Sequence, residues 1–365
     1  MGTERDDIST VRVGLMGFGY WGRNLARNIA ASPTTELVAV CDPDERVLQS
    51  AASALPSVSV ARTQSEMLER TDIDAVVIAT PAATHADVAV SALAAGKHIM
   101  VEKPLALSVA DAEEIVDAGA RAGRIVMVGH TFLYAPPVRR LRRYVDEGEL
   151  GDVQYIYSQR LSLGRIRRDC NALWNFAPHD ISVMLYLTGE LPTEVSARGF
   201  SFISQTVEDV YFGSVSFASG VGGNFHVSWI DPRKSRLLTV VGNRKMAVYD
   251  DVSVDQKIQL FDAGVAVASD STGEYESLGE FQWKTRSGDI VIPNIAMTEP
   301  LLLEMEAFGE ACVTGVAPLA DGRHGADVVR ILSAAEESAH QHGAPVAIDW
   351  RHAAGGARVS LAVTG

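Results

Sequence analysis

Short apolar runs alternate with helical patterns along the first 130 residues of the chain. The runs are apolar throughout rather than alternating, which is typical of strands buried on both faces of a parallel sheet. They occupy residues 11–17, 36–42, 75–80, 98–103 and 125–130. Helical patterns lie between them, at residues 21–31, 84–95 and 108–122. This alternation predicts a doubly wound α/β domain with right-handed crossovers over residues 1–133.

The rest of the chain has a different pattern. A basic amphipathic helix is expected at 136–151, followed by a half-buried strand and a second helix at 174–189. Residues 193–285 show consecutive strand patterns and turn signals without a helix long enough to act as a crossover, which predicts an antiparallel sheet with one open face. We therefore expect an α+β domain over residues 134–365, with C-terminal helices within 299–342.

The composition is that of a folded, acidic protein. Of the 365 residues, 47% are hydrophobic and 21% are charged, which excludes a disordered chain. The formal net charge of −14 argues against a nucleic-acid partner and against an anionic membrane surface, because both need clustered Lys and Arg. Cys41, Cys170 and Cys312 are too widely spaced to indicate a disulfide framework or a metal site.

Neither a membrane segment nor a signal peptide is predicted. No apolar run approaches the roughly 18–20 residues that a transmembrane helix needs. The first ten residues are polar and acidic, unlike the start of a signal peptide. We expect a cytoplasmic protein.

A glycine-rich sequence, GFGYWG, follows the first expected strand and opens the first expected helix. Gly17 permits a tight turn, Gly19 lets a pyrophosphate approach the backbone, and Gly22 lets the helix pack closely on the strand. This strand–glycine–helix context is typical of dinucleotide binding. The other residues of the motif, which we also expect to contact the cofactor, are Phe18, Tyr20 and Trp21.

An acidic residue stands at the expected distance after the glycine motif. Asp42 ends the second strand, 20 residues after Gly22, where a carboxylate accepts from the adenosine 2′-hydroxyl and repels a 2′-phosphate. Arg46, four residues further on, could instead accommodate that phosphate. NAD is therefore the expected cofactor and NADP the less favoured alternative; a structural glycine turn with a solvated Asp remains the third interpretation.

Polar residues follow the later strands, at the sheet edge where ligands of doubly wound folds bind. They are Thr80, Pro81, Glu102, Lys103 and His130. Pro104 favours an extended conformation of Lys103, which would fix the direction of its ammonium group. Near the nicotinamide this cation could bind a substrate oxygen and stabilise developing alkoxide charge. The alternative is a surface ion pair between Lys103 and Glu102.

Two histidines near these strand ends have different interpretations. His85 begins a predicted helix, so contact with the cofactor and capping of that helix are equally expected. His130 is interpreted as a packed or supporting residue rather than as a catalyst.

The segment WNFAPHD places an amide and an imidazole four residues apart, on one face of a helix. Pro178 lacks a backbone donor and therefore favours the first turn of this helix, close to Asn175 and His179. An imidazole can take a proton from a substrate hydroxyl as hydride leaves the same carbon, although a structural histidine is the alternative. His179 and Lys103 fall in different predicted domains, so an active cleft between domains is expected.

Together these segments resemble the glucose–fructose oxidoreductase/inositol dehydrogenase (Gfo/Idh/MocA) family over essentially the whole chain. The resemblance runs from residues 13–28 through 80–105 and 129–138 to 174–187, and continues at 228–251 and in the helical C-terminus. Its most specific element is the Glu-Lys-Pro motif at 102–104. It implies a Rossmann domain followed by an α+β domain whose open sheet often makes oligomer contacts. It also implies oxidation or reduction of a carbon that carries a hydroxyl or ketone in sugars, cyclitols or nucleotide sugars.

The resemblance also implies roles for particular residues. Lys103 matches the family's motif lysine and His179 its helix histidine. The family usually carries an Asp four residues before that histidine; this chain has Asn175, which can hydrogen-bond but cannot act as a base. A proton relay through this position is therefore in doubt.

The subgroup it resembles acts at C3 of nucleotide-linked or amino sugars, as UDP-N-acetylglucosaminuronate 3-dehydrogenase-like proteins do. Besides Asn175, the candidate substrate contacts are Trp174 and Arg160. Arg165 and Arg167 could add positive charge for a substrate phosphate or carboxylate; a solvated strand end is the alternative for all three arginines.

The predicted function is NAD(P)-dependent hydride transfer between nicotinamide and a ring carbinol or ketone of a sugar or nucleotide sugar. Two alternatives stay open: a non-catalytic dinucleotide-sensing regulator, for which Asn175 is weak support, and a ketone or imine reductase of a secondary-metabolite pathway. A homodimer or homotetramer is expected because an uncovered apolar sheet face needs a partner.

Overall fold

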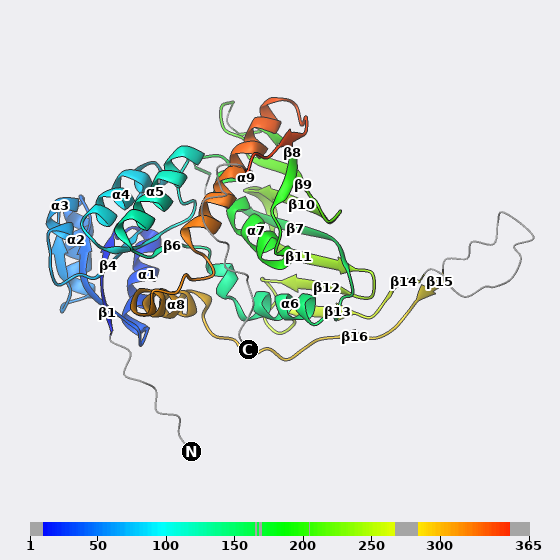
Figure 1. The fold of residues 1–365 in the computed structure, drawn as a ribbon, viewed down its shortest axis with the longest axis horizontal. Helices are drawn as coiled ribbons and strands as arrows, with labels where there is room; N and C mark the ends of the chain where they lie inside the picture. The colour runs from blue at the N-terminus through cyan, green and yellow to red at the C-terminus, as the bar shows by residue number, and fades with distance from the viewer. Residues whose placement is uncertain (1–9, 165, 168–169, 204, 267–283, 351–365) are drawn as a thin grey trace, which may run out of the picture. The chain divides into compact units, whose positions relative to one another are not determined.

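The computed structural model describes residues 10–164, 166–167, 170–203, 205–266 and 284–350. They form two compact units, each built on its own sheet (Figure 1). Among the described residues, the first unit holds 10–135 and 297–333, and the second holds 136–296 and 334–350.

The first unit is built on a six-stranded parallel sheet with the strand order β3-β2-β1-β4-β5-β6. Its strands are β1 (Val11–Met16), β2 (Thr35–Cys41), β3 (Ser59–Ala61), β4 (Ala75–Ile78), β5 (His98–Val101) and β6 (Val126–Val128). Its helices are α1 (Tyr20–Ala31), α2 (Glu45–Ala54), α3 (Gln64–Leu68), α4 (His85–Ala94), α5 (Val109–Ala122) and α8 (Pro300–Thr314), with short 3-10 turns η1 (Ala82–Thr84) and η2 (Thr131–Tyr134).

Burial on both faces explains why these strands are apolar throughout. Every residue of β4 is fully buried. Right-handed crossovers from β1 and from β4 run in opposite directions along the sheet, so they place α1 on one face and α4 and α5 on the other. The predicted doubly wound domain is confirmed. Strand β3 was not predicted, because it is a short edge strand in which only Ala61 is buried.

Helix α8 belongs to the first unit, although it comes from the far end of the chain. The Glu299 carboxylate at its start accepts hydrogen bonds from Arg27 and Asn28 of α1. Gly309 lies against the backbone and side chain of Thr34, so closely that a Cβ there would be 2.3 Å from the hydroxyl oxygen of Thr34. The sequence interpretation places α8 with the second domain; its partners in α1 and at Thr34 are distant in sequence and carry no sequence signal.

The second unit is built on a nine-stranded, mainly antiparallel sheet with the order β16-β13-β12-β11-β7-β10-β9-β8-β17, in which β7 and β10 form a parallel pair. Its strands are β7 (Val153–Leu163), β8 (Pro192–Phe200), β9 (Val210–Phe217), β10 (Gly222–Ser228), β11 (Ile230–Gly242), β12 (Met246–Asp250), β13 (Ile258–Phe261), β16 (Ile290–Val291) and β17 (Val346–Ala347). A separate two-stranded ribbon joins β14 (Gly264–Ala266) to β15 (Lys284–Arg286). The helices are α6 (Pro136–Asp146), α7 (Ala172–Thr188) and the second part of α9 (Gly322–His340).

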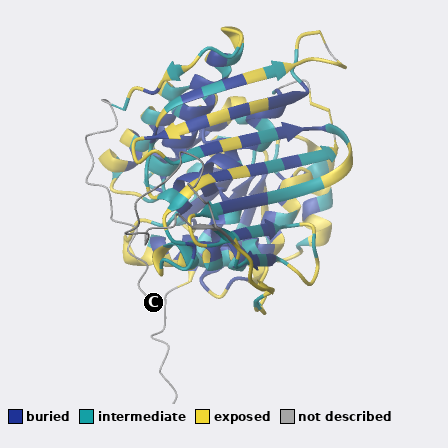
Figure 2. Cartoon of the chain, turned by 90° about the vertical axis from the view of Figure 1, so that its right-hand side faces the viewer, coloured by how far each residue is buried: buried dark blue, intermediate teal, exposed yellow. Residues whose placement is uncertain are grey.

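The two faces of this sheet differ in burial, as the alternating bands along the strands in Figure 2 show. Ile156 and Phe225 lie on the face that α7 covers and are buried. Tyr157 and Phe212 point to the other face and are 37% and 47% exposed. The expected open face is therefore present in the single chain.

Helix α7 begins earlier than predicted. Asn171 is its N-cap, and the Asn171 side chain accepts from the backbone N–H of Trp174 at 3.1 Å. Pro178 consequently lies in the helix interior and not in the first turn, which corrects the sequence prediction. The helix ends at Gly189, which adopts the left-handed conformation typical of this position.

Candidate functional site

The glycine loop has the geometry of a phosphate-binding turn. Gly17 has a φ of +92°, and its N–H donates to the carbonyl of Cys41. Gly22 packs against this turn, since a Cβ on Gly22 would lie 2.1 Å from the Gly17 carbonyl oxygen. A Cβ on Gly19 would meet no atom within 4 Å. Gly19 therefore leaves open space at the N-terminus of α1, where a pyrophosphate fits.

Asp42 is held in place beside this loop. One carboxylate oxygen accepts from the N–H of Phe18 at 2.9 Å, and the other accepts from the N–H of Asp44 at 3.0 Å. Each carboxylate oxygen can accept more than one hydrogen bond, so Asp42 can still receive a ribose hydroxyl. Phe18 is 3% exposed, and its N–H is already used by Asp42. Arg46 is exposed in the first turn of α2.

Glu102 joins the glycine loop to the segment after β5. Its carboxylate accepts from the indole N–H of Trp21 at 2.5 Å and from the backbone N–H of Lys103 at 3.1 Å. Gly129 makes room for it, because a Cβ on Gly129 would lie 3.0 Å from the carboxyl atoms. Burial raises the pKa of Glu102, whereas the Trp21 hydrogen bond and the Lys103 ammonium act in the opposite direction.

The other residues predicted at this edge differ in exposure. Lys103 is half-buried and precedes a cis peptide bond to Pro104. Tyr20 is exposed, Trp21 is 41% exposed, Thr80 is half-buried and Pro81 is exposed.

His85 is buried and lies between two backbone carbonyl groups. Its Nδ1 lies 2.8 Å from the carbonyl oxygen of Pro104, and its Nε2 lies 3.0 Å from that of Thr80. The imidazole thus connects the end of β4 to the Glu-Lys-Pro segment, and its side chain does not cap α4. Burial lowers the pKa of His85 below its usual value. A neutral imidazole has a single N–H, so His85 can donate to only one of these two carbonyl oxygens.

A second buried polar group lies beneath the Glu-Lys-Pro segment. Glu304 of α8 is fully buried and accepts from the Thr131 hydroxyl at 2.8 Å. Burial, together with the negative charge of Glu102, raises the pKa of Glu304 well above its usual value.

His130 is also buried, with its ring edge against His324 at a centroid distance of 5.4 Å, and burial lowers its pKa strongly. The packed interpretation of His130 fits this environment.

In the second unit, the N-terminal half of α7 reaches solvent along one face. Asn175, Phe176 and His179 are half-buried, whereas the residues between and around them are buried. Asn175 and His179 therefore share one accessible face, as predicted. Phe176 was missed, because a single aromatic residue in an apolar segment does not reveal which face it occupies.

Arg160 and Trp174 are turned inward. Arg160 forms an ion pair with Asp180, with nitrogen–oxygen distances of 2.8 and 3.2 Å. Trp174 is 5% exposed and donates its indole N–H to Glu336 at 3.1 Å. The Arg160 guanidinium and the Trp174 indole N–H thus both hydrogen-bond to carboxylates within the protein. Arg167 is exposed, and Arg165 lies outside the described residues.

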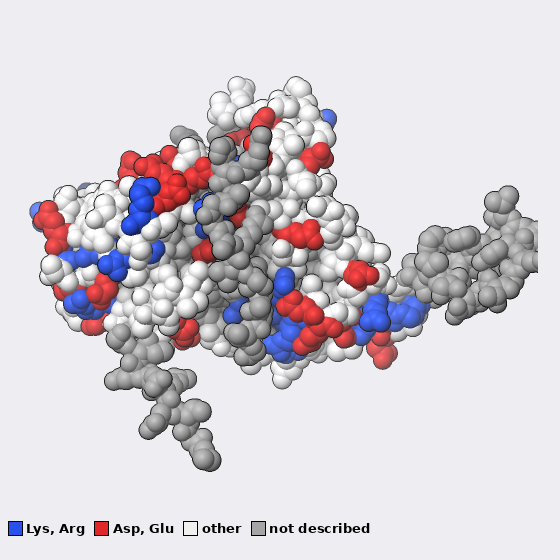
Figure 3. Space-filling model, viewed as in Figure 1, with Lys and Arg blue, Asp and Glu red and all other residues white. Residues whose placement is uncertain are grey.

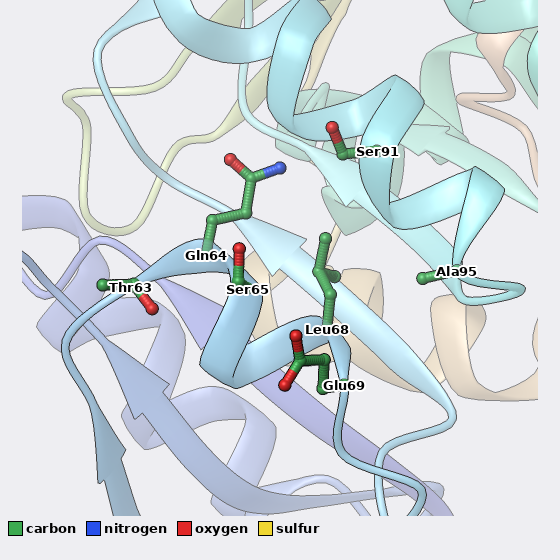
Figure 4. Close-up of a pocket in the computed structure, with 7 residues that line it drawn as sticks. All are labelled: Thr63, Gln64, Ser65, Leu68, Glu69, Ser91 and Ala95. Carbon is green, nitrogen blue, oxygen red and sulfur yellow. The ribbon is translucent and has the colours of Figure 1, made fainter.

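The described part of the chain also has a surface groove outside the predicted site residues. A groove between α3 and α4 is lined by Thr63, Gln64, Ser65, Leu68, Glu69, Ser91 and Ala95, none of them a predicted site residue (Figure 4). Among the described residues, no group of His, Cys, Asp or Glu is arranged to hold a metal ion, and no helix is long and apolar enough to span a membrane. On the face drawn in Figure 3, basic and acidic side chains are interspersed.

The chain belongs to the Gfo/Idh/MocA oxidoreductase family. Residues 11–130 match the family described as "Oxidoreductase family, NAD-binding Rossmann fold", and residues 138–248 match the "GFO/IDH/MocA C-terminal domain". The predicted family, fold class and NAD-binding domain are thus confirmed.

Among curated relatives, scyllo-inositol 2-dehydrogenase (NAD(+)) of Bacillus subtilis is 26% identical over 94% of this chain and 98% of its own length. Inositol 2-dehydrogenase of Rhizobium meliloti is 27% identical over 90% and 97%. Some matches are partial: an uncharacterized oxidoreductase of Streptococcus pneumoniae is 29% identical over 52% of this chain, and the chain spans about half (53%) of that relative.

Solved structures share the fold. Levoglucosan dehydrogenase in complex with NADH and levoglucosan has a TM-score of 0.79 at 22% identity, covering 93% of this chain and 100% of the other. GenD2 from gentamicin A biosynthesis in complex with NAD has a TM-score of 0.78 at 24% identity, covering 96% and 99%.

Proposed function

We propose that this protein is an NAD-dependent dehydrogenase that transfers hydride between nicotinamide and a ring carbinol or ketone of a sugar or polyol. The observation that carries the proposal is the edge formed by the open Gly19 position, the fixed Asp42 carboxylate and Lys103 after β5. Relatives matched over nearly their full length support it, since one is named scyllo-inositol 2-dehydrogenase (NAD(+)) and another inositol 2-dehydrogenase.

Asp42 sets the cofactor preference in this proposal. A bound NAD supplies hydride acceptance, which no amino-acid side chain provides. The carboxylate of Asp42 accepts from a ribose 2′-hydroxyl and repels a 2′-phosphate. For NADP to be preferred, Arg46 would have to bind the 2′-phosphate from its exposed position.

Lys103 and His179 have complementary proton and charge roles. The Lys103 ammonium donates a hydrogen bond to the reacting oxygen and stabilises negative charge on it. His179 takes the hydroxyl proton during oxidation and returns it during reduction. Asn175, on the same face of α7, holds a neighbouring hydroxyl through its amide and transfers no proton.

The finer substrate assignment is a nucleotide-linked or amino sugar reacting at C3. The support is the sequence resemblance of the 174–187 segment, together with the origin of GenD2 in gentamicin A biosynthesis. Levoglucosan and inositol, on which other relatives act, are the competing substrate types.

Two measurements test the proposal. Denaturing the purified protein and identifying any released nucleotide by mass spectrometry, followed by fluorescence titration with NADH and NADPH, tests the cofactor. We expect NAD(H). A panel of scyllo-inositol, levoglucosan and UDP-N-acetylglucosamine with NAD then tests the substrate class by NADH absorbance. Binding of NADH without turnover of any sugar or polyol would favour a dinucleotide-sensing regulator.

We also propose that a second copy of the chain covers the open sheet face. Phe212 stacks on His226 with the ring centroids 4.1 Å apart, and Phe200 meets Phe212 edge to face at 6.1 Å, so the three rings lie in a row across β8, β9 and β10. Exposed apolar area of this kind favours association. Light scattering after gel filtration should give a dimer or tetramer, and Phe212→Lys should shift it toward monomer; a monomeric wild type would refute this assignment.

A further inference from the structure

His179 and the next residue, Asp180, lie in different environments on α7. Asp180 is 3% exposed and points to the sheet, whereas His179 is half-buried on the accessible face of α7. Consecutive helical residues are separated by about 100° around the helix axis. The direction of Asp180 therefore determines the direction of His179, provided that the helix stays regular.

Asp180 is held by Arg160 of β7. The Nε and Nη2 atoms of Arg160 donate to the two carboxylate oxygens at 2.8 and 3.2 Å. The side chains are 10% and 4% exposed, so water competes little for either group. A two-point contact between a planar guanidinium and a carboxylate fixes orientation as well as distance.

Two further polar anchors of α7 lie near its ends. Asn171, eight residues before His179, donates to Glu336 at 3.0 Å. Arg142 donates to the carbonyl oxygen of Tyr186, seven residues after His179, at 2.7 Å. The Arg160–Asp180 pair is thus an anchor of α7 directly next to His179 in sequence.

We propose that Arg160 is a positioning residue: its ion pair with Asp180 sets the rotation of α7 and so aims His179 at the reacting hydroxyl. This inference rests on the proposed role of His179 and replaces a direct substrate contact for Arg160. Because a displacement of about 1 Å in a catalytic group can cost about a hundredfold in rate, loss of the two-point contact should reduce turnover without affecting cofactor binding.

The test compares two arginine anchors of the same helix. Arg160→Lys keeps the positive charge and removes the two-point guanidinium contact. Arg142→Lys makes the same change near the C-terminal end of α7, where the Arg142 side chain is similarly buried at 14% exposure. With the best substrate of the panel, we expect Arg160→Lys to lower kcat about tenfold or more while the KM for NAD changes less than twofold. Arg142→Lys should change kcat less than twofold.

Combining Arg160→Lys with His179→Ala distinguishes an effect that acts through His179 from a general loss of activity. If Arg160 acts through His179, then adding Arg160→Lys to His179→Ala should cause no further loss of kcat. An additive loss, or equal effects of the two arginine variants, would overturn the inference. Full activity of His179→Ala alone would overturn the proposed role of His179 and this inference with it, whereas the NADH titration would still report the cofactor site.

A spectroscopic readout keeps the inference testable without any substrate. The chain has nine histidines, and ¹³C-labelled imidazole signals can be assigned to His179 through the His179→Ala variant. Arg160→Lys should move the His179 signal and Arg142→Lys should leave it in place. An unmoved signal in Arg160→Lys would contradict the proposal.

Discussion

The indole N–H of Trp21 donates to the carboxylate of Glu102 across 2.5 Å, joining the first turn of α1 to the end of β5. The two residues are 81 positions apart in sequence and belong to the two motifs of the cofactor edge. The carboxylate is buried, and Lys103 donates its own N–H to it. The glycine loop and the Glu-Lys-Pro segment are therefore fixed to one another.

Trp21→Phe should weaken NADH binding about tenfold, because a hydrogen bond to a charged group is worth about 1.5–3 kcal/mol and its loss frees both elements. NADH fluorescence titration measures this. Trp174→Phe is the matched control, since Trp174 also donates to a carboxylate, that of Glu336, but in the second unit. Equal loss of NADH affinity in both variants would contradict the role of Trp21.

Gly19 and Gly22 should respond differently to alanine. A Cβ on Gly19 meets nothing within the protein, and its φ of −68° suits any residue. Gly19→Ala should keep the melting temperature and lose NADH affinity by about tenfold or more, because the methyl group occupies the pyrophosphate position. Gly22→Ala should lower the melting temperature, since its Cβ would lie 2.1 Å from a carbonyl oxygen. Wild-type NADH affinity in Gly19→Ala would refute the phosphate assignment.

Asp42→Ser should shift preference from NADH toward NADPH by about tenfold or more, because the repulsion of the 2′-phosphate is removed. Competitive titration with both nucleotides measures the ratio of the two Kd values. Asp44→Ser is the control: Asp44 caps α2 through the N–H of Arg46, so its replacement should leave the ratio unchanged. A wild type that already prefers NADPH would place the preference in Arg46 or its neighbours.

Glu304 should make stability depend on pH. Its pKa is raised in the folded protein from 4.5, so the folded state binds its proton more tightly than the unfolded state does. The favourable contribution of Glu304 to the free energy of unfolding is fully present below about pH 4.5. It is lost as the pH rises toward the pKa that Glu304 has in the folded protein.

Glu304→Gln removes this titration and keeps an acceptor for Thr131. Its melting temperature should therefore rise relative to wild type between pH 5 and pH 8, by about 2 °C or more. Glu306→Gln, on the same helix at a half-buried position, should show no such trend. Parallel curves for Glu304→Gln and wild type would show that Glu304 is not a buried acid.

The local signals in the sequence predicted most of what positions the cofactor edge. The glycine spacing and Asp42 both depend on residues close together in the chain. Helix α7 was predicted to begin too late, because the prediction relied on Pro178, whereas Asn171 caps the helix. A proline can occupy a helix interior where packing offsets its missing hydrogen bond.

The remaining parts of the site depend on tertiary contacts. The inward direction of Arg160, the burial of His85 and the approach of Glu304 to the Glu-Lys-Pro segment each need a partner far along the chain. A basic, an aromatic or an acidic residue alone does not show whether it faces solvent or an internal partner. This is why Arg160 and Trp174 were predicted as substrate contacts.

The most direct test of the central claim is transfer of deuterium from substrate to cofactor. Scyllo-inositol, levoglucosan and UDP-N-acetylglucosamine deuterated at the ring carbons are incubated with NAD and enzyme, and the NADH mass is measured. We predict labelled NADH with the wild type, and a loss of label formation of about a hundredfold or more in Lys103→Ala and His179→Ala. Bound NAD that never acquires deuterium from any of these compounds would contradict a sugar or polyol dehydrogenase.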